Sequence, residues 1–146
     1  MGDTFNDLHR NGQRLNLLDL AITAAISATT TSPITTLAGA KYLAVEANFA
    51  YGSGGTNATV YVQTSLDGGS NWIDIMSFQF TTSDARKVSA VVASTALAAG
   101  ATPTDGTLTA NTILSGLLGD RIRLKYVTTG TYADDTSLVV SAIVKG

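Results

Sequence analysis

The residues that could carry out chemistry in this chain are few, and the single histidine, His9, is the first of them. Histidine titrates near neutral pH and often acts as a general base, but a base needs neighbours that orient it. His9 lies in a polar N-terminal segment that offers no such neighbour, so we interpret it as a solvated or interface residue. The chain also lacks Gly-x-Ser-x-Gly, His-Glu-x-x-His and glycine-rich phosphate-binding motifs. We therefore expect no catalytic residue, no enzymatic activity and no cofactor.

Aspartates are the second group of candidates, because carboxylate oxygens are ligands for hard cations. Asp134 and Asp135 are adjacent, Asp67 and Asp74 flank a hairpin sequence, and Asp105 lies in the turn sequence Pro-Thr-Asp-Gly. A calcium ion takes about six to eight oxygen ligands from a converging loop, and neither an EF-hand nor a nonapeptide spacing is present. Aspartate side chains also hydrogen-bond the backbone of turns. We therefore predict that these carboxylates cap turns and that the chain has no metal site.

The most specific local motif is the segment 65–72, SLDGGSNW. It is similar to the Asp box, S-x-D-x-G-x-T-W, of sialidases and other β-propellers, with Asn71 where threonine is usual. In those proteins the motif braces a hairpin away from the active site, and the resemblance implies the same turn chemistry here. One copy occurs and the chain is too short for a propeller, so no sialidase activity is implied. We expect Asp67 to accept hydrogen bonds from turn amides and Trp72 to pack under the turn.

Three cations, Arg121, Arg123 and Lys125, alternate with apolar residues near the C-terminus. Because side chains alternate between the two faces of a strand, this pattern predicts a strand with one apolar and one cationic face. Charged residues make up only 14% of the chain, so three cations in one row stand out. Two interpretations remain open. The row could bind an anionic neighbour, or it could be a solvated face that discourages edge-to-edge aggregation.

Alternation of apolar with polar or small residues continues through most of the chain, as expected of strands that position these side chains. It occurs in the segments 18–26, 41–51, 59–65, 72–80, 86–93, 121–126 and 137–145. In 72–80 the pattern sets Trp72, Asp74 and Met76 on one face and Ile75 on the other. The long connection 94–119 is typical of a binding or interface loop. We predict an all-β fold, an antiparallel β-sandwich or jelly roll of about seven or eight strands.

The N-terminal segment 1–18 differs from the rest, because it contains the histidine and a dense share of the charges. Its apolar residues are Phe5, Leu8, Leu15 and Leu18. Four such side chains bury too little surface to offset the conformational entropy of ordering the segment. We therefore predict two units, an N-terminal arm over 1–18 and a β-sandwich domain over 19–146. We expect the arm to pack on another polypeptide through these four residues.

Charge and composition exclude several classes of partner. The net charge is −2, so the chain has no electrostatic footprint for nucleic acid. It has no cysteine, which removes disulfides and thiolate metal sites. No apolar run reaches the roughly 18 residues of a membrane span, and Asp19 interrupts the stretch that most resembles a signal peptide. We expect a protein made in the cytoplasm, unprocessed, with no membrane partner.

Over 41–146 the sequence resembles a group of small structural proteins of tailed bacteriophages and prophages. The resemblance lies in 60–75 (VYVQTSLDGGSNWIDI), 78–88 (FQFTTSDARKV), 102–132 (TPTDGTLTANTILSGLLGDRIRLKYVTTGTY) and the closing apolar strand. It implies a location in the virion, with synthesis in the host cytoplasm, and it implies no catalytic residue.

Within a virion, the resemblance favours a capsid decoration (cement) protein. Such proteins are small β-sandwiches with an N-terminal arm, bind the major capsid protein on the outside of the head, and are commonly trimers. The arm residues and the cationic row then become candidate contacts with virion subunits. One alternative is a head–tail or tail component. An alternative of another class is a carbohydrate-binding or host-adhesion module.

Overall fold

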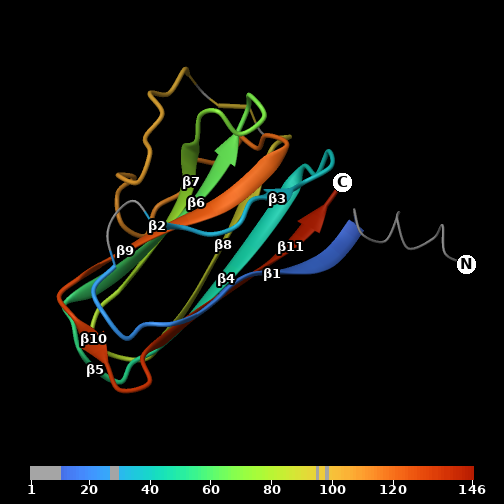
Figure 1. Cartoon of the computed structure of the whole chain (residues 1–146). Coiled ribbons are helices and arrows are strands. Elements are labelled where there is room, and N and C mark those ends of the chain that lie inside the picture. Colours follow the sequence, from blue (N-terminus) through green and yellow to red (C-terminus); the bar gives the residue numbers. More distant parts are fainter. Residues whose placement is uncertain (1–10, 27–29, 95, 98) are drawn as a thin grey trace, which may run out of the picture.

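The computed structural model describes residues 11–26, 30–94, 96–97 and 99–146. These residues form strands and no helix (Figure 1), which confirms the predicted all-β fold. The strands are β1 (Asn11–Ala21), β2 (Thr30–Thr31), β3 (Thr35–Thr36), β4 (Tyr42–Ala50), β5 (Ser53–Gly54), β6 (Asn57–Ser65), β7 (Ile73–Phe80), β8 (Ala85–Val92), β9 (Arg121–Thr129), β10 (Tyr132–Ala133) and β11 (Ser137–Lys145).

Two antiparallel sheets pack face to face, so the predicted β-sandwich is confirmed. Sheet A has the strand order β1-β11-β4-β8. Sheet B has the order β2-β9-β6-β7, with β3 also paired to β9. The short strands β5 and β10 form a separate pair at one end of the sandwich.

The strand pairing is nested along the chain. The first strand pairs with the last, β2 and β3 pair with β9, and the innermost pair is the β6–β7 hairpin. β4 and β8 are neighbours in sheet A. The connections before and after that hairpin therefore cross between the sheets. Asp67-Gly68-Gly69, the hairpin signal of the sequence, closes the innermost pair, and both glycines adopt positive φ, 74° and 99°.

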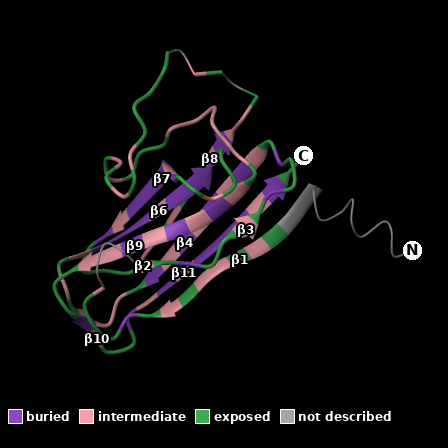
Figure 2. Cartoon of the chain, turned by 45° about the horizontal axis from the view of Figure 1, so that its top comes forward, coloured by how far each residue is buried: buried purple, intermediate pink, exposed green. Residues whose placement is uncertain are grey.

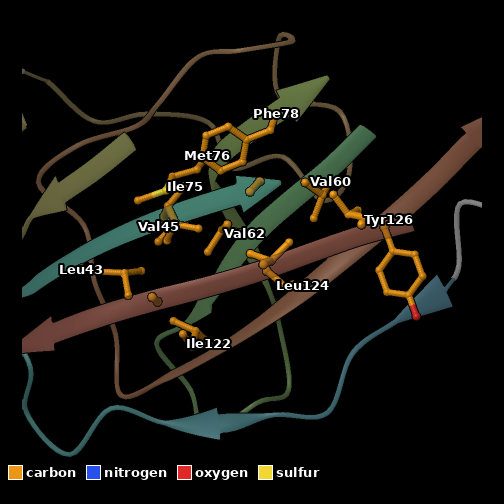
Figure 3. Packing of buried hydrophobic residues seen from close by; sticks show 14 of the residues in the cluster. Leu43, Val45, Val60, Val62, Ile75, Met76, Phe78, Ile122, Leu124 and Tyr126 are labelled. Carbon is orange, nitrogen blue, oxygen red and sulfur yellow. The ribbon is translucent and has the colours of Figure 1, made fainter. Parts of the chain in front are cut away.

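The core lies between the inner faces of the two sheets (Figure 3). Sheet A contributes residues such as Leu43 and Val45 of β4, and sheet B contributes Val62 and Leu124. Each of these four side chains is almost completely buried. Burial of one such side chain stabilises the fold by about 1.5–3 kcal/mol. The alternation predicted in 41–51, 121–126 and 137–145 is confirmed by the burial patterns of β4, β9 and β11.

Because of a β-bulge in β7, the side chains of 72–80 are distributed over the two faces of the sheet differently from the prediction. Val62 pairs with Met76, but the next residue of β6, Gln63, pairs with Asp74, so Ile75 is an extra residue. A one-residue insertion moves the side chains beyond it to the other face. The expectation that Asp74 shares a face with Met76 was therefore wrong. Ile75 is buried in the core, and Asp74 lies beside Gln63 on the outer side of sheet B.

The long connection after β8 is tied to the free edge of β7. The amide of Asp74 donates to the Thr104 carbonyl at 2.9 Å, and the amide of Ser77 donates to the Thr112 carbonyl at 3.0 Å. The Leu114 amide donates to the Ile75 carbonyl at 2.9 Å. An unpaired strand edge would otherwise be open to pairing with another chain. This segment thus covers one edge of sheet B.

Candidate functional site

The turn between β6 and β7 is held by the Asp67 carboxylate, as the sequence predicts. It accepts hydrogen bonds from the amides of Ser70 at 3.1 Å and Asn71 at 2.9 Å. The side-chain amide of Asn71 also donates to it at 2.6 Å. These hydrogen bonds, of which that from the Asn71 side chain is the strongest influence, lower the pKa of Asp67 from 3.8 to about 2. The predicted capping role is confirmed.

Trp72 packs under this turn, which confirms the second part of the prediction. Its side chain is buried, and a Cβ placed on Gly69 would lie 3.7 Å from the ring. The guanidinium carbon of Arg123, a residue of β9, lies 4.4 Å from the centroid of the Trp72 ring. A cation over an indole ring is a favourable contact. The ring is therefore covered by its own chain and is not free to stack on a ligand.

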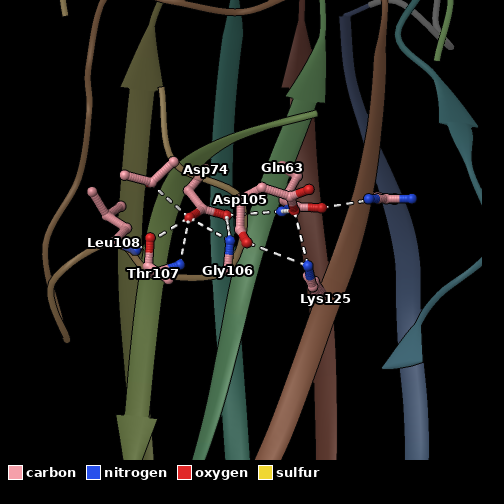
Figure 4. A network of polar contacts seen from close by, with 9 residues as sticks. Gln63, Asp74, Asp105, Gly106, Thr107, Leu108 and Lys125 are labelled. Atoms are coloured by element: carbon pink, nitrogen blue, oxygen red, sulfur yellow. Dashed lines mark hydrogen bonds and ion pairs between the residues drawn. The ribbon is translucent and has the colours of Figure 1, made fainter. Parts of the chain in front are cut away.

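A buried carboxylate, Asp74, anchors the long connection to sheet B (Figure 4). Its oxygens accept hydrogen bonds from the amides of Gly106 at 2.7 Å, Thr107 at 3.0 Å and Leu108 at 3.1 Å. Thr104 Oγ1 donates to it at 2.8 Å, and Gln63 Nε2 donates at 2.8 Å. Asp74 is 1% exposed, so all these donors compensate for the removal of its charge from water. The carboxylate is fully used as a structural anchor.

The cationic row of β9 meets this network. Arg123 Nε donates to Gln63 Oε1 at 2.8 Å, and Gln63 Nε2 donates to Asp105 Oδ1 at 2.6 Å. Lys125 Nζ forms an ion pair with Asp105 Oδ1 at 3.0 Å. Partial burial would raise the pKa of Asp105, but the hydrogen bonds from Gln63 and Lys125 outweigh it and lower that pKa. Burial lowers the pKa of Arg123, and the Asp105 carboxylate opposes this effect.

Arg123 and Lys125 thus contact residues of their own chain. The sequence suggested either an anionic partner or a solvated face for the cationic row, and neither interpretation included such internal contacts. Arg121 differs, because its Nε lies 3.8 Å from Asp120 and has no hydrogen-bond partner among the described residues. Contact of Arg121, Arg123 and Lys125 with a partner polypeptide stays a prediction.

The structure places the second half of the predicted arm in sheet A. Residues 11–18 belong to β1, which pairs with β11 along its length. Leu15 and Leu18 pack against the core of their own domain. The inference that this half needs a partner to become ordered was therefore wrong, because β11 supplies its backbone hydrogen bonds. Phe5 and Leu8 lie outside the described residues.

Sequence reasoning missed the outer face of sheet A. Its middle carries small or apolar side chains, including Ala44 of β4, Ala90 of β8 and Ile143 of β11, which line an open hollow of about 470 Å³. Val88, at the edge of this hollow, is 65% exposed. Exposed apolar surface of this kind marks interaction sites. The signal was present in the sequence, because outward positions of 41–51 and 137–145 carry alanine and isoleucine where a solvated sheet carries charge.

One charged residue, Glu46 of β4, lines the hollow itself and stands between Ser141 of β11 and Val88 of β8. Glu46 accepts a hydrogen bond from the Arg86 guanidinium, which lowers the pKa of Glu46. Arg14 of β1 borders the hollow on the opposite side. This face thus combines small and apolar side chains with the Glu46–Arg86 ion pair and with Arg14.

Neither a metal centre nor a bilayer span is found in the described part of the chain. No three side chains of His, Cys, Asp or Glu lie close enough there to hold a metal ion. The same residues contain no helix of the length and hydropathy needed to cross a bilayer. No protein-family model matches this chain, and no curated protein matches its sequence.

Proposed function

We propose that this chain is a non-enzymatic structural protein of a bacteriophage virion, and that it decorates the outside of the capsid. The observation that carries the proposal is the nested strand order. We interpret first-to-last pairing around one innermost hairpin as a jelly-roll order, an architecture that viral capsid domains use. The resemblance of 41–146 to phage structural proteins points the same way.

The outer face of sheet A supports a subunit that is held by its neighbours. Its centre, around Ala44 and Ala90, has small side chains that let another polypeptide approach closely. Exposed Val88 would be covered in such a contact. We assign this face to contact with the major capsid protein.

The use of the polar groups also supports a structural role. A catalytic carboxylate or base must be able to reach a substrate. Asp74, the most buried carboxylate in the network of sheet B, has its oxygens occupied by donors from its own chain. Asp67 is occupied by its turn. Both groups stabilise the fold.

A second candidate function is host adhesion through glycan binding, because lectin domains also use the jelly roll. The burial of Trp72 under Arg123 weighs against it, since the ring most suited to stacking on a sugar is covered. A head–tail or tail position is the remaining alternative within the virion.

Binding to particles tests the proposal. Purified chain is added to capsids that lack it, and occupancy is measured after sedimentation. We expect saturable binding that Val88→Asp weakens by about tenfold or more, because a charge would be buried in the interface. Thr82→Asp adds the same charge on an exposed loop outside this face and should bind like the unmodified chain.

Three results would contradict the proposal. The chain could fail to bind capsids, it could bind tails alone, or it could bind glycans and attach to particles independently of Val88. The last result would support the adhesion function instead.

A further inference from the structure

We infer that the free edge of β1 pairs with β1 of a second copy of this chain, antiparallel and about a two-fold axis. The inference goes beyond the proposed function, because it concerns only the association of the chain with itself.

The other sheet edges are short, covered, or linked by side chains to the connection before β9. β2 and β3 have two residues each. The edge of β7 is bonded to the segment around Thr112. β8, at the other end of sheet A, has eight residues and is linked to that segment by Lys87, whose Nζ donates to Asn111 Oδ1 at 2.9 Å. β1 is longer, at 11 residues, and stands at the end of sheet A. Its second edge pairs with no strand of the described chain (Figure 1), and Figure 2 shows no buried position along it from Arg14 to Ala21.

A β-bulge decides which residues of β1 share a face. Asn16 pairs with Ser141 and Leu18 pairs with Val140, so Leu17 is an extra residue. Before the bulge Arg14 pairs with Ile143, and after it Asp19 pairs with Val139. Ile143 and Val139 are outward positions of β11, so Arg14 and Asp19 both lie on the outer face despite their odd spacing.

This arrangement makes β1 complementary to itself. Directly opposed residues of an antiparallel pair must lie on the same face. In the register that sets Arg14 opposite Asp19 of the second copy, symmetry also sets Asp19 opposite Arg14 of the second copy. The same register sets Leu15 opposite Leu18 on the inner face. Both charged side chains are exposed, and neither forms an ion pair with another described residue.

The bulge fixes the register, and the symmetry of the contact limits the association to two copies. In this register the two bulges face each other at the axis, and the regular parts of each strand pair on either side. A bulge prevents pairing in shifted registers, which would oppose side chains of different faces. The contact uses the same surface on both copies and therefore closes at a dimer. This predicts two-fold association, in place of the trimer that the resemblance to cement proteins implies.

Charge reversal tests the register. Sedimentation velocity at low salt should show a dimer, and either Arg14→Asp or Asp19→Arg should raise its dissociation constant by about tenfold or more, because two pairs of like charges then face each other. The double variant, Arg14→Asp with Asp19→Arg, restores both pairs and should return the dissociation constant to within about threefold of the original. Lys41→Asp, a matched change outside β1, should leave it unaltered. Circular dichroism establishes that each variant is folded.

Disulfide trapping tests the pairing separately, because the chain has no cysteine of its own. Directly opposed Cα atoms lie about 4.5–5.5 Å apart, within the range a disulfide spans. A mixture of the Arg14→Cys and Asp19→Cys single variants should oxidise to a crosslinked dimer, whereas either variant alone should not. A monomeric or trimeric unmodified chain, a dimer unaffected by Arg14→Asp, or crosslinking of one single variant with itself would overturn the inference.

Discussion

Asp74→Ala is the substitution from which we expect the largest effect on stability. The Asp74 carboxylate is 1% exposed and accepts hydrogen bonds from the side chains of Gln63 and Thr104 and from three backbone amides between Gly106 and Leu108. A hydrogen bond to a charged group contributes about 1.5–3 kcal/mol, but the loop donors can regain water when the loop is released. The expected loss is therefore about 3–5 kcal/mol in the free energy of unfolding, the range found when one partner of a buried polar network is removed.

Urea denaturation followed by Trp72 fluorescence measures this loss, and hydrogen exchange locates it. The amides of Gly106, Thr107 and Leu108 should lose their protection first, because they bond only to the missing carboxylate. Asp105→Ala is the matched control. Its side chain is half-exposed and pairs with Lys125, so we expect a loss of only about 0–1 kcal/mol.

A loss below about 1 kcal/mol for Asp74→Ala, with unchanged exchange at these amides, would refute the anchoring role. Equal losses for Asp74→Ala and Asp105→Ala would also refute it, because burial would then make no difference.

Three further predictions concern the hairpin and the turns. Because the pKa of Asp67 is lowered from 3.8 to about 2, its contribution to stability is present above about pH 4 and is lost as the pH falls towards 2; the difference in Tm between the chain and Asp67→Asn should shrink over that interval. Arg123→Ala should cost about 1–2 kcal/mol and shift Trp72 emission, and Arg123→Lys should restore neither, because lysine cannot both cover the ring and bond the glutamine side chain. Gly52→Ala should cost at least about 2 kcal/mol in urea denaturation, since its Cβ would overlap backbone atoms, whereas Gly100→Ala meets no atom and should be neutral.

The strands that were predicted correctly from sequence are those with one face buried in the core and the other face turned outward. Leu43 and Leu124 stand in such strands, where the period of two follows directly from geometry. The hairpin at Asp67 could also be predicted from sequence, because the hydrogen bonds to Asp67 come from residues only three and four positions further along the chain. Both signals are local, so a single sequence carries them.

The features that sequence reasoning missed depend on distant partners. The bulge at Ile75 exists only in relation to β6, and one extra residue reverses the faces that alternation predicts. The segment 11–18 resembles a free arm because its order comes from β11, at the other end of the chain. The role of Asp74 depends on donors around Gly106, and no local pattern links these two positions.

The most direct test of the proposed function is a cryo-electron-microscopy difference map between phage particles with and without this chain. We predict additional density on the outside of the head, fitted by the β-sandwich with the outer face of sheet A, around Val88, turned towards the shell. Identical maps, or additional density confined to the tail, would contradict capsid decoration.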